Sequence, residues 1–121
     1  MFPRLRTEQN PLVDADQVAR NDAIFREANE GIERAAQQLG GAERVPFICE
    51  CADLSCRDVV RLTLPEYDDV RSSPIRFFVA AGHELVGTEL EEVIARRPGY
   101  VVVEKRAGAA PLAADLDPRS G

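Results

Sequence analysis

Three cysteines and the only histidine are the residues of this chain best suited to metal chemistry. Cys49, Cys51 and Cys56 follow the pattern C-E-C-x4-C, and His83 lies in the run A-G-H-E. Three thiolates and one imidazole supply the four ligands of a tetrahedral Cys3His zinc site. The sequence therefore predicts a structural Zn2+ ion, one per chain, bound by these four side chains.

The spacing of the cysteines suits a shared ion. In an extended segment, residues two apart point to the same side, so Cys49 and Cys51 can face one metal. The intervening residues 52–55 leave room for a turn that returns Cys56 to them. Backbone N–H groups in such a turn can donate to the thiolates.

Two acidic residues adjoin the predicted ligands. Gly82 lets the backbone bend before His83, and Glu84 is the residue that we expect to orient the imidazole. Glu50 would serve as a general base only if the metal kept an open coordination position.

The same four residues are compatible with other chemistries. They could be reduced, partly buried cysteines beside a surface histidine, or a thiol pair that cycles with a disulfide. A thiol activated by His83 is a further alternative, whereas an iron–sulfur cluster usually needs four cysteines. The gathering of every cysteine with the only histidine favours the zinc site.

A long helix is predicted before the cysteines, over residues 14–39. Its apolar residues recur at helical steps: Val18, Phe25, Ala28, Ile32, Ala35 and Leu39. Asp14 or Asp16 can cap its start, and Gly40-Gly41 would end it. We expect the apolar stripe to lie against the domain's own sheet; docking to a protein partner or a second copy is the alternative.

The remaining elements predict an α+β fold. The cysteine motif lies between two predicted strands, and Thr63 and Glu66 have the spacing of a capping box that starts a short second helix. The predicted strands are residues 45–49, 59–64, 75–80 and 100–105, while residues 89–96 are a strand or a short helix. We expect the N-terminal helix to pack on a small antiparallel sheet with a zinc knuckle.

The chain of 121 residues suits a single domain, predicted over residues 14–106. Residues 1–13 contain two prolines and several polar side chains, which predicts a flexible lead-in. Residues 107–121 are rich in Ala, Pro and Asp without a period, which predicts a disordered tail.

Composition limits the classes of function. The net charge of −6 argues against binding to nucleic acid, which favours basic surfaces. No apolar run is long enough for a membrane helix, and MFPRLRTEQN has no apolar core of a secretory signal. With an odd number of cysteines, these features predict a cytoplasmic protein without a disulfide framework.

Three stretches of the chain, residues 47–56, 60–84 and 99–105, carry F-x-C-E-C-x4-C, then a segment ending in G-H-E, then G-Y-x-V-V-E-K. In these motifs the chain resembles a family of small actinobacterial-type proteins. The resemblance covers residues 20–105, implies the limits of the domain, and carries no activity.

Together these features predict a non-enzymatic protein-interaction or regulatory module, with the helix over residues 14–39 and the chain ends as its contact elements. A zinc-thiolate redox sensor is the first alternative, because three thiolates make such a site oxidisable. A zinc-dependent enzyme is the second, and it would need an open coordination position.

Overall fold

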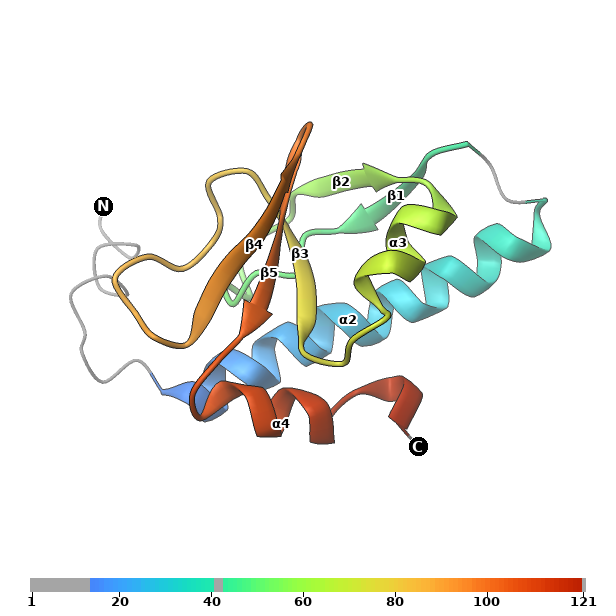
Figure 1. Ribbon diagram of the computed structural model, residues 1–121. Coiled ribbons are helices and arrows are strands. Elements are labelled where there is room, and N and C mark those ends of the chain that lie inside the picture. The colour runs from blue at the N-terminus through green and yellow to red at the C-terminus, as the bar shows by residue number, and fades with distance from the viewer. Residues whose placement is uncertain (1–13, 41–42, 121) are drawn as a thin grey trace.

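The computed structural model describes residues 14–40 and 43–120, which form a small α+β fold (Figure 1). Its elements are α2 (Ala15–Gln38), β1 (Val45–Ile48), β2 (Val59–Leu62), α3 (Leu64–Val70), β3 (Arg76–Ala80), β4 (Glu91–Arg97), β5 (Tyr100–Lys105) and α4 (Ala109–Asp115), followed by a 3-10 helix at Pro118–Ser120. The α+β class agrees with the prediction. The predicted lead-in, residues 1–13, lies outside the described residues.

The strands form two antiparallel sheets instead of the single sheet that the sequence predicts. One sheet pairs β1 with β2, and the other has the strand order β3-β5-β4. Residues 89–96, left open as strand or helix, contribute β4, which returns through Gly99 (φ 86°) to pair with β5. The chain leaves β1 for the cysteine loop after Ile48, so no continuous ladder joins the two sheets.

Aromatic rings fill the space where the two sheets and α3 meet. Phe47 of β1 stacks on Tyr67 of α3, with ring centroids 4.3 Å apart. Phe78 of β3 meets both rings edge-on, at centroid distances of 6.2 and 6.1 Å. All three side chains are fully buried, so the sheets are joined by apolar packing more than by backbone pairing.

Helices α2 and α3 begin at caps that the sequence indicates. The Thr63 hydroxyl accepts from the Glu66 N–H, and the Glu66 carboxylate accepts from the Thr63 N–H, which completes the predicted capping box of α3. Asp14 caps α2, because its carboxylate accepts from the N–H of Asp16 at 2.9 Å.

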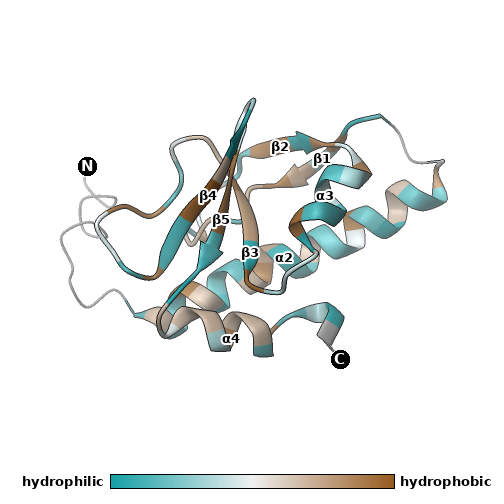
Figure 2. Ribbon diagram, viewed as in Figure 1, coloured by the Kyte–Doolittle hydropathy of each residue, from teal (hydrophilic) through white to brown (hydrophobic). Residues whose placement is uncertain are grey.

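The face that α2 turns toward the sheets is polar, which corrects the prediction of an apolar contact stripe. Its buried polar residues are Asp22, Arg26, Asn29, Glu30 and Glu33. In the predicted stripe, Val18 and Phe25 are buried and Ile32 is partly buried, whereas Ala28, Ala35 and Leu39 are exposed. Figure 2 likewise shows much of α2 as hydrophilic, with the most apolar residues in the strands. Charged partners on other elements meet this face, and helical periodicity does not reveal such partners.

The prediction of a disordered tail over residues 107–121 is wrong for α4. Ala109 and Ala113 are buried, and α4 lies alongside α2 (Figure 1). Beyond α4, the Arg119 guanidinium contacts Glu30 at 2.8 Å. A helix this short is stabilised by its contacts with the rest of the domain. Its sequence shows no helical periodicity, which explains why the sequence did not predict it.

Candidate metal centre

The loop between β1 and β2 carries the three cysteines to the end of β3. The N–H of Glu50 donates to the carbonyl of Phe78 at 3.1 Å, which fixes the start of the loop beside β3. A turn follows, in which the N–H of Cys56 donates to the carbonyl of Asp53 at 2.9 Å. This turn returns the third cysteine to the first two, as the spacing predicts.

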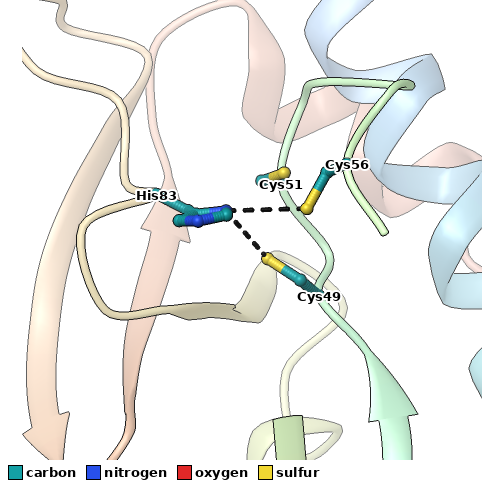
Figure 3. A group of neighbouring side chains, drawn as sticks. All are labelled: Cys49, Cys51, Cys56 and His83. Atoms are coloured by element: carbon teal, nitrogen blue, oxygen red, sulfur yellow. Dashed lines mark hydrogen bonds between the residues drawn. The ribbon is translucent and has the colours of Figure 1, made fainter. Parts of the chain in front are cut away.

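His83 reaches the same place from the other side, through a tight turn after β3. Its N–H donates to the carbonyl of Ala80 at 2.9 Å, and Gly82 has a φ of 91°, which glycine adopts without strain. The turn directs the imidazole toward the cysteine loop (Figure 3).

The structure brings together all four predicted ligands: Cys49, Cys51, Cys56 and His83. One ligand atom from each lies within 4.8 Å of all the others. The Sγ atoms of Cys49 and Cys56 are each 3.6 Å from Nδ1 of His83 (Figure 3). At tetrahedral angles, a zinc ion with Zn–S of about 2.3 Å and Zn–N of about 2.05 Å separates sulfur from nitrogen by about 3.6 Å. The cluster therefore has the dimensions of a site for one metal ion.

The cluster is buried on one side and open on the other. Cys49 and Cys51 are 0% and 5% exposed, whereas Cys56 is partly buried and the His83 side chain is 31% exposed. Cys56 also lines a shallow, mainly apolar groove with Ile24, Phe25, Ile48, Leu54 and Arg57. An ion at this centre would lie near the surface, with its cover supplied mostly by the cysteine loop.

Two further contacts orient the ligand atoms. Asp58 Oδ2 lies 3.1 Å from Nε2 of His83, which leaves Nδ1 to face the three sulfurs. A carboxylate on the far nitrogen of a metal-binding histidine fixes the ring and raises its basicity. The N–H of Ala80 donates to Sγ of Cys49 at 3.2 Å, and such a bond stabilises a thiolate.

Asp58 contacts the His83 imidazole, so the prediction that Glu84 orients the ring is wrong. Glu84 accepts from the N–H of Gly82 at 3.0 Å and pairs with Arg96, so it shapes the turn and does not orient the ring. Side chains of adjacent residues in this turn diverge, whereas Asp58 at the start of β2 faces His83 across the loop. The only sequence signal for Asp58 is its position two residues after the last cysteine.

The thiols differ in acidity because they share hydrogen bonds within the cluster. The hydrogen bond with Cys49, assisted by His83, lowers the pKa of Cys51 to about 5. The same bond with Cys51, together with burial, raises the pKa of Cys49, and burial also raises the pKa of Cys56. Metal binding requires all three side chains as thiolates, so an ion that binds here displaces the protons that they carry.

Glu50, which lies between two of the cysteines, is not an available base. Its side chain is 0% exposed and receives two hydrogen bonds from Arg26, at 2.9 and 2.8 Å. Asn29 and the N–H of Phe78 donate to it as well, at 2.9 and 3.3 Å. Arg26 and Asn29 have no motif that could have marked them, because on a helix they resemble ordinary polar surface.

Comparison with known proteins adds no family to these findings. No family model matches the chain, and no significant match is found among curated proteins or solved structures. What bears on function is therefore the geometry of the four side chains.

Proposed function

We propose that the protein binds one zinc ion through Cys49, Cys51, Cys56 and His83, and that this ion is structural. The observation that carries the proposal is the pair of 3.6 Å sulfur–nitrogen distances within a cluster no wider than 4.8 Å. Soft thiolate ligands with an imidazole in tetrahedral array favour zinc over harder cations. Four protein ligands would also fill the tetrahedron, which leaves no position for a reacting water.

The ion would add a link between two parts of the chain that are otherwise joined mainly by apolar packing. Three ligands come from the loop between β1 and β2, and the fourth follows β3 of the other sheet. The two sheets share no continuous ladder. In a domain of this size, metal binding at such a junction adds directly to the free energy of folding.

Metal analysis of protein purified without a metal-affinity tag tests the assignment. We expect about one zinc per chain, and its loss when Cys51 is replaced by Ser. Leu54→Ala, an exposed position in the same loop, is the matched control and should retain the metal. Protein that binds no zinc when zinc is supplied, or that keeps it without Cys51, would contradict the assignment.

As to its role, we propose a non-enzymatic protein-interaction or regulatory module, with α2 as a contact element for another protein or a second copy. Two apolar side chains on α2 support this, because Ile24 is 55% and Leu39 is 86% exposed. Within residues 14–40 and 43–120, no helix is long and apolar enough to cross a membrane. Sizing at several concentrations tests self-association, and Ile24→Ser should remove any larger species.

A redox-responsive zinc site is the second candidate, favoured by the partial exposure of Cys56. One peroxide would oxidise two thiolates to a disulfide, take up two protons, leave as two waters and release the ion. Reversible zinc release by mild peroxide would support this candidate. Zinc that survives peroxide able to oxidise a model thiol indicates a shielded, purely structural site.

A further inference from the structure

We infer that Glu50 is a positioning residue that links metal occupancy of the centre to the docking of α2. The inference rests on the proposed zinc site and extends it to regulation. Glu50 is the residue between Cys49 and Cys51, so the two ligands and this carboxylate belong to one short extended segment. Alternation along that segment places the sulfurs toward His83 and the carboxylate toward α2.

Side chains of α2 bind the Glu50 carboxylate through several hydrogen bonds. Arg26 binds it through two N–H groups, and the two side chains are 1% and 0% exposed. The Arg26 guanidinium also lies over the Phe77 ring, 4.0 Å from its centroid. A planar, bidentate pair of this kind fixes both the distance and the orientation of the carboxylate.

Asn29, one turn further along α2, holds the chain just before the ligands. Its amide donates to the carbonyl of Ile48 at 2.8 Å and accepts from the N–H of the same residue at 2.8 Å. It also donates to Glu50. Asn29 thus binds the backbone at the end of β1, and Arg26 and Asn29 together bind the carboxylate between the first two cysteines.

The linkage follows from the cost of a buried charge. Glu50 can stay in its buried position only while Arg26 and Asn29 supply its hydrogen bonds, because an unpaired buried carboxylate is strongly disfavoured. If α2 undocks, Glu50 must turn toward water, and Cys49 and Cys51 then leave the positions that suit one ion. By reciprocity, metal that fixes the two cysteines strengthens the docking of α2 by the same factor.

Two matched double variants test the linkage. Arg26→Met with Glu50→Gln removes the charge pair beside the ligands. The glutamine oxygen can accept from Asn29 or from the N–H of Phe78 but not from both, because these groups donate to different oxygens of Glu50. Glu30→Gln with Arg71→Met makes the same chemical changes in a buried pair that joins α2 to the end of α3. Zinc affinity is measured by competition with a chelator, and Co2+ absorption reports the ligand geometry.

We expect the first variant to bind zinc roughly 10-fold or more weakly, as with other residues that support metal ligands, and to shift the Co2+ bands. The control variant should keep the Co2+ absorption bands of the wild type and lose less zinc affinity. This holds even if its melting temperature falls as far as that of the first variant. Asn29→Ala, a milder change, should weaken binding in the same direction if the double variant does not fold.

Equal loss of affinity in the two double variants at matched stability would overturn the linkage, as would wild-type affinity in a folded Asn29→Ala protein. A wild-type chain that binds neither zinc nor Co2+ would instead overturn the proposed function, and the linkage with it. The two failures are therefore distinguishable.

Discussion

The metal centre and the buried face of α2 both hold distant segments together with polar side chains, yet they differ in what neutralises the charge. The face of α2 is balanced by cationic side chains: Arg26 of α2 pairs with Glu50, and Arg71 at the end of α3 pairs with Glu30. The metal centre has no cationic residue among its four ligands. Once its thiols ionise, an added cation must balance them.

This difference separates two sources of stability in one small domain. The ion pairs of α2 form whenever the chain folds, and their contribution is limited because burial of both charges costs nearly as much as their attraction returns. The thiolate cluster contributes little alone and much with a metal, because the free energy of metal binding adds to that of folding. The comparison can be tested region by region.

The largest expected effect is that of Cys49→Ser, which removes a fully buried candidate ligand. We expect loss of zinc together with most of the folded structure, since structural zinc contributes about 10–16 kcal/mol in zinc-finger peptides. That is comparable to the roughly 5–15 kcal/mol stability of ordinary domains. Zinc content and circular-dichroism melts, with and without a chelator, measure both losses. Wild-type melting of the chelated protein would show that the metal centre is not a source of stability.

Breaking the Arg71–Glu30 pair, which does not contact the cysteine loop, should cost less and leave the metal in place. Arg71→Met removes the buried cation that Glu30 and Asp117 share. Glu30 keeps its hydrogen bonds from Tyr67 and Arg119, so we expect a loss of about 3 kcal/mol in the free energy of unfolding. Arg20→Met, which breaks the exposed pair with Asp16, should leave the free energy of unfolding nearly unchanged. Denaturant unfolding and zinc content check both variants. Zinc loss in Arg71→Met would mean that the Arg71–Glu30 pair also supports metal binding.

The two regions also differed in how far the sequence predicted them. The gathering of the four candidate ligands was predictable because cysteine and histidine are rare here and their spacing restricts the geometry. The carboxylate that contacts Nε2 of His83 was not predictable. Glu84 is adjacent to His83 in sequence, whereas Asp58 is adjacent only in space. The strands and the cap of α3 followed from local patterns, which tertiary contacts did not override.

The buried face of α2 was not predictable from the helix alone. Arg26 and Glu30 have the composition of a solvated surface, and their partners lie 24 and 41 residues away along the chain. Periodicity measures where apolar residues recur, so it assigned the contact to the stripe that ends in Leu39. The docking of α4 was missed for the same reason, since its contacts are with α2 and not within itself.

The apolar stripe predicted along residues 14–39 gives a third prediction, which compares a buried residue of the stripe with an exposed one. Phe25 is 8% exposed, so Phe25→Ala should lower the free energy of unfolding by about 3 kcal/mol. Leu39 is 86% exposed, so Leu39→Ala should change it by less than about 0.5 kcal/mol. Thermal melts with sizing separate folding from association. A Phe25→Ala protein that melts like wild type but loses a larger species would favour a docking role for that side chain.

The smallest effect expected for a buried group is the pH dependence that Glu30 contributes to stability. Burial opposes ionisation of Glu30, but hydrogen bonds from Arg119, Tyr67 and Arg71 prevail and lower its pKa to about 2. The unfolded chain has the ordinary glutamate pKa, which is higher, so it binds a proton first as the pH falls. The stability that this carboxylate contributes is therefore present above about pH 5 and is lost as the pH falls toward 2.

Glu30→Gln isolates that contribution, because the variant cannot ionise at this position. We expect wild type to exceed it by about 2 kcal/mol at pH 7, less than the full pKa shift implies, since solvent screens the Arg119 side of the network. The difference should shrink below about pH 4.5. Urea unfolding of both proteins, from pH 7 to the acid limit of the folded state, measures it. Protonation of the thiolates releases metal from both proteins alike, so the metal centre cancels from the difference and only the ion pairs of α2 remain. A difference that stays constant with pH would show that Glu30 acts through packing and hydrogen bonding and not through its charge.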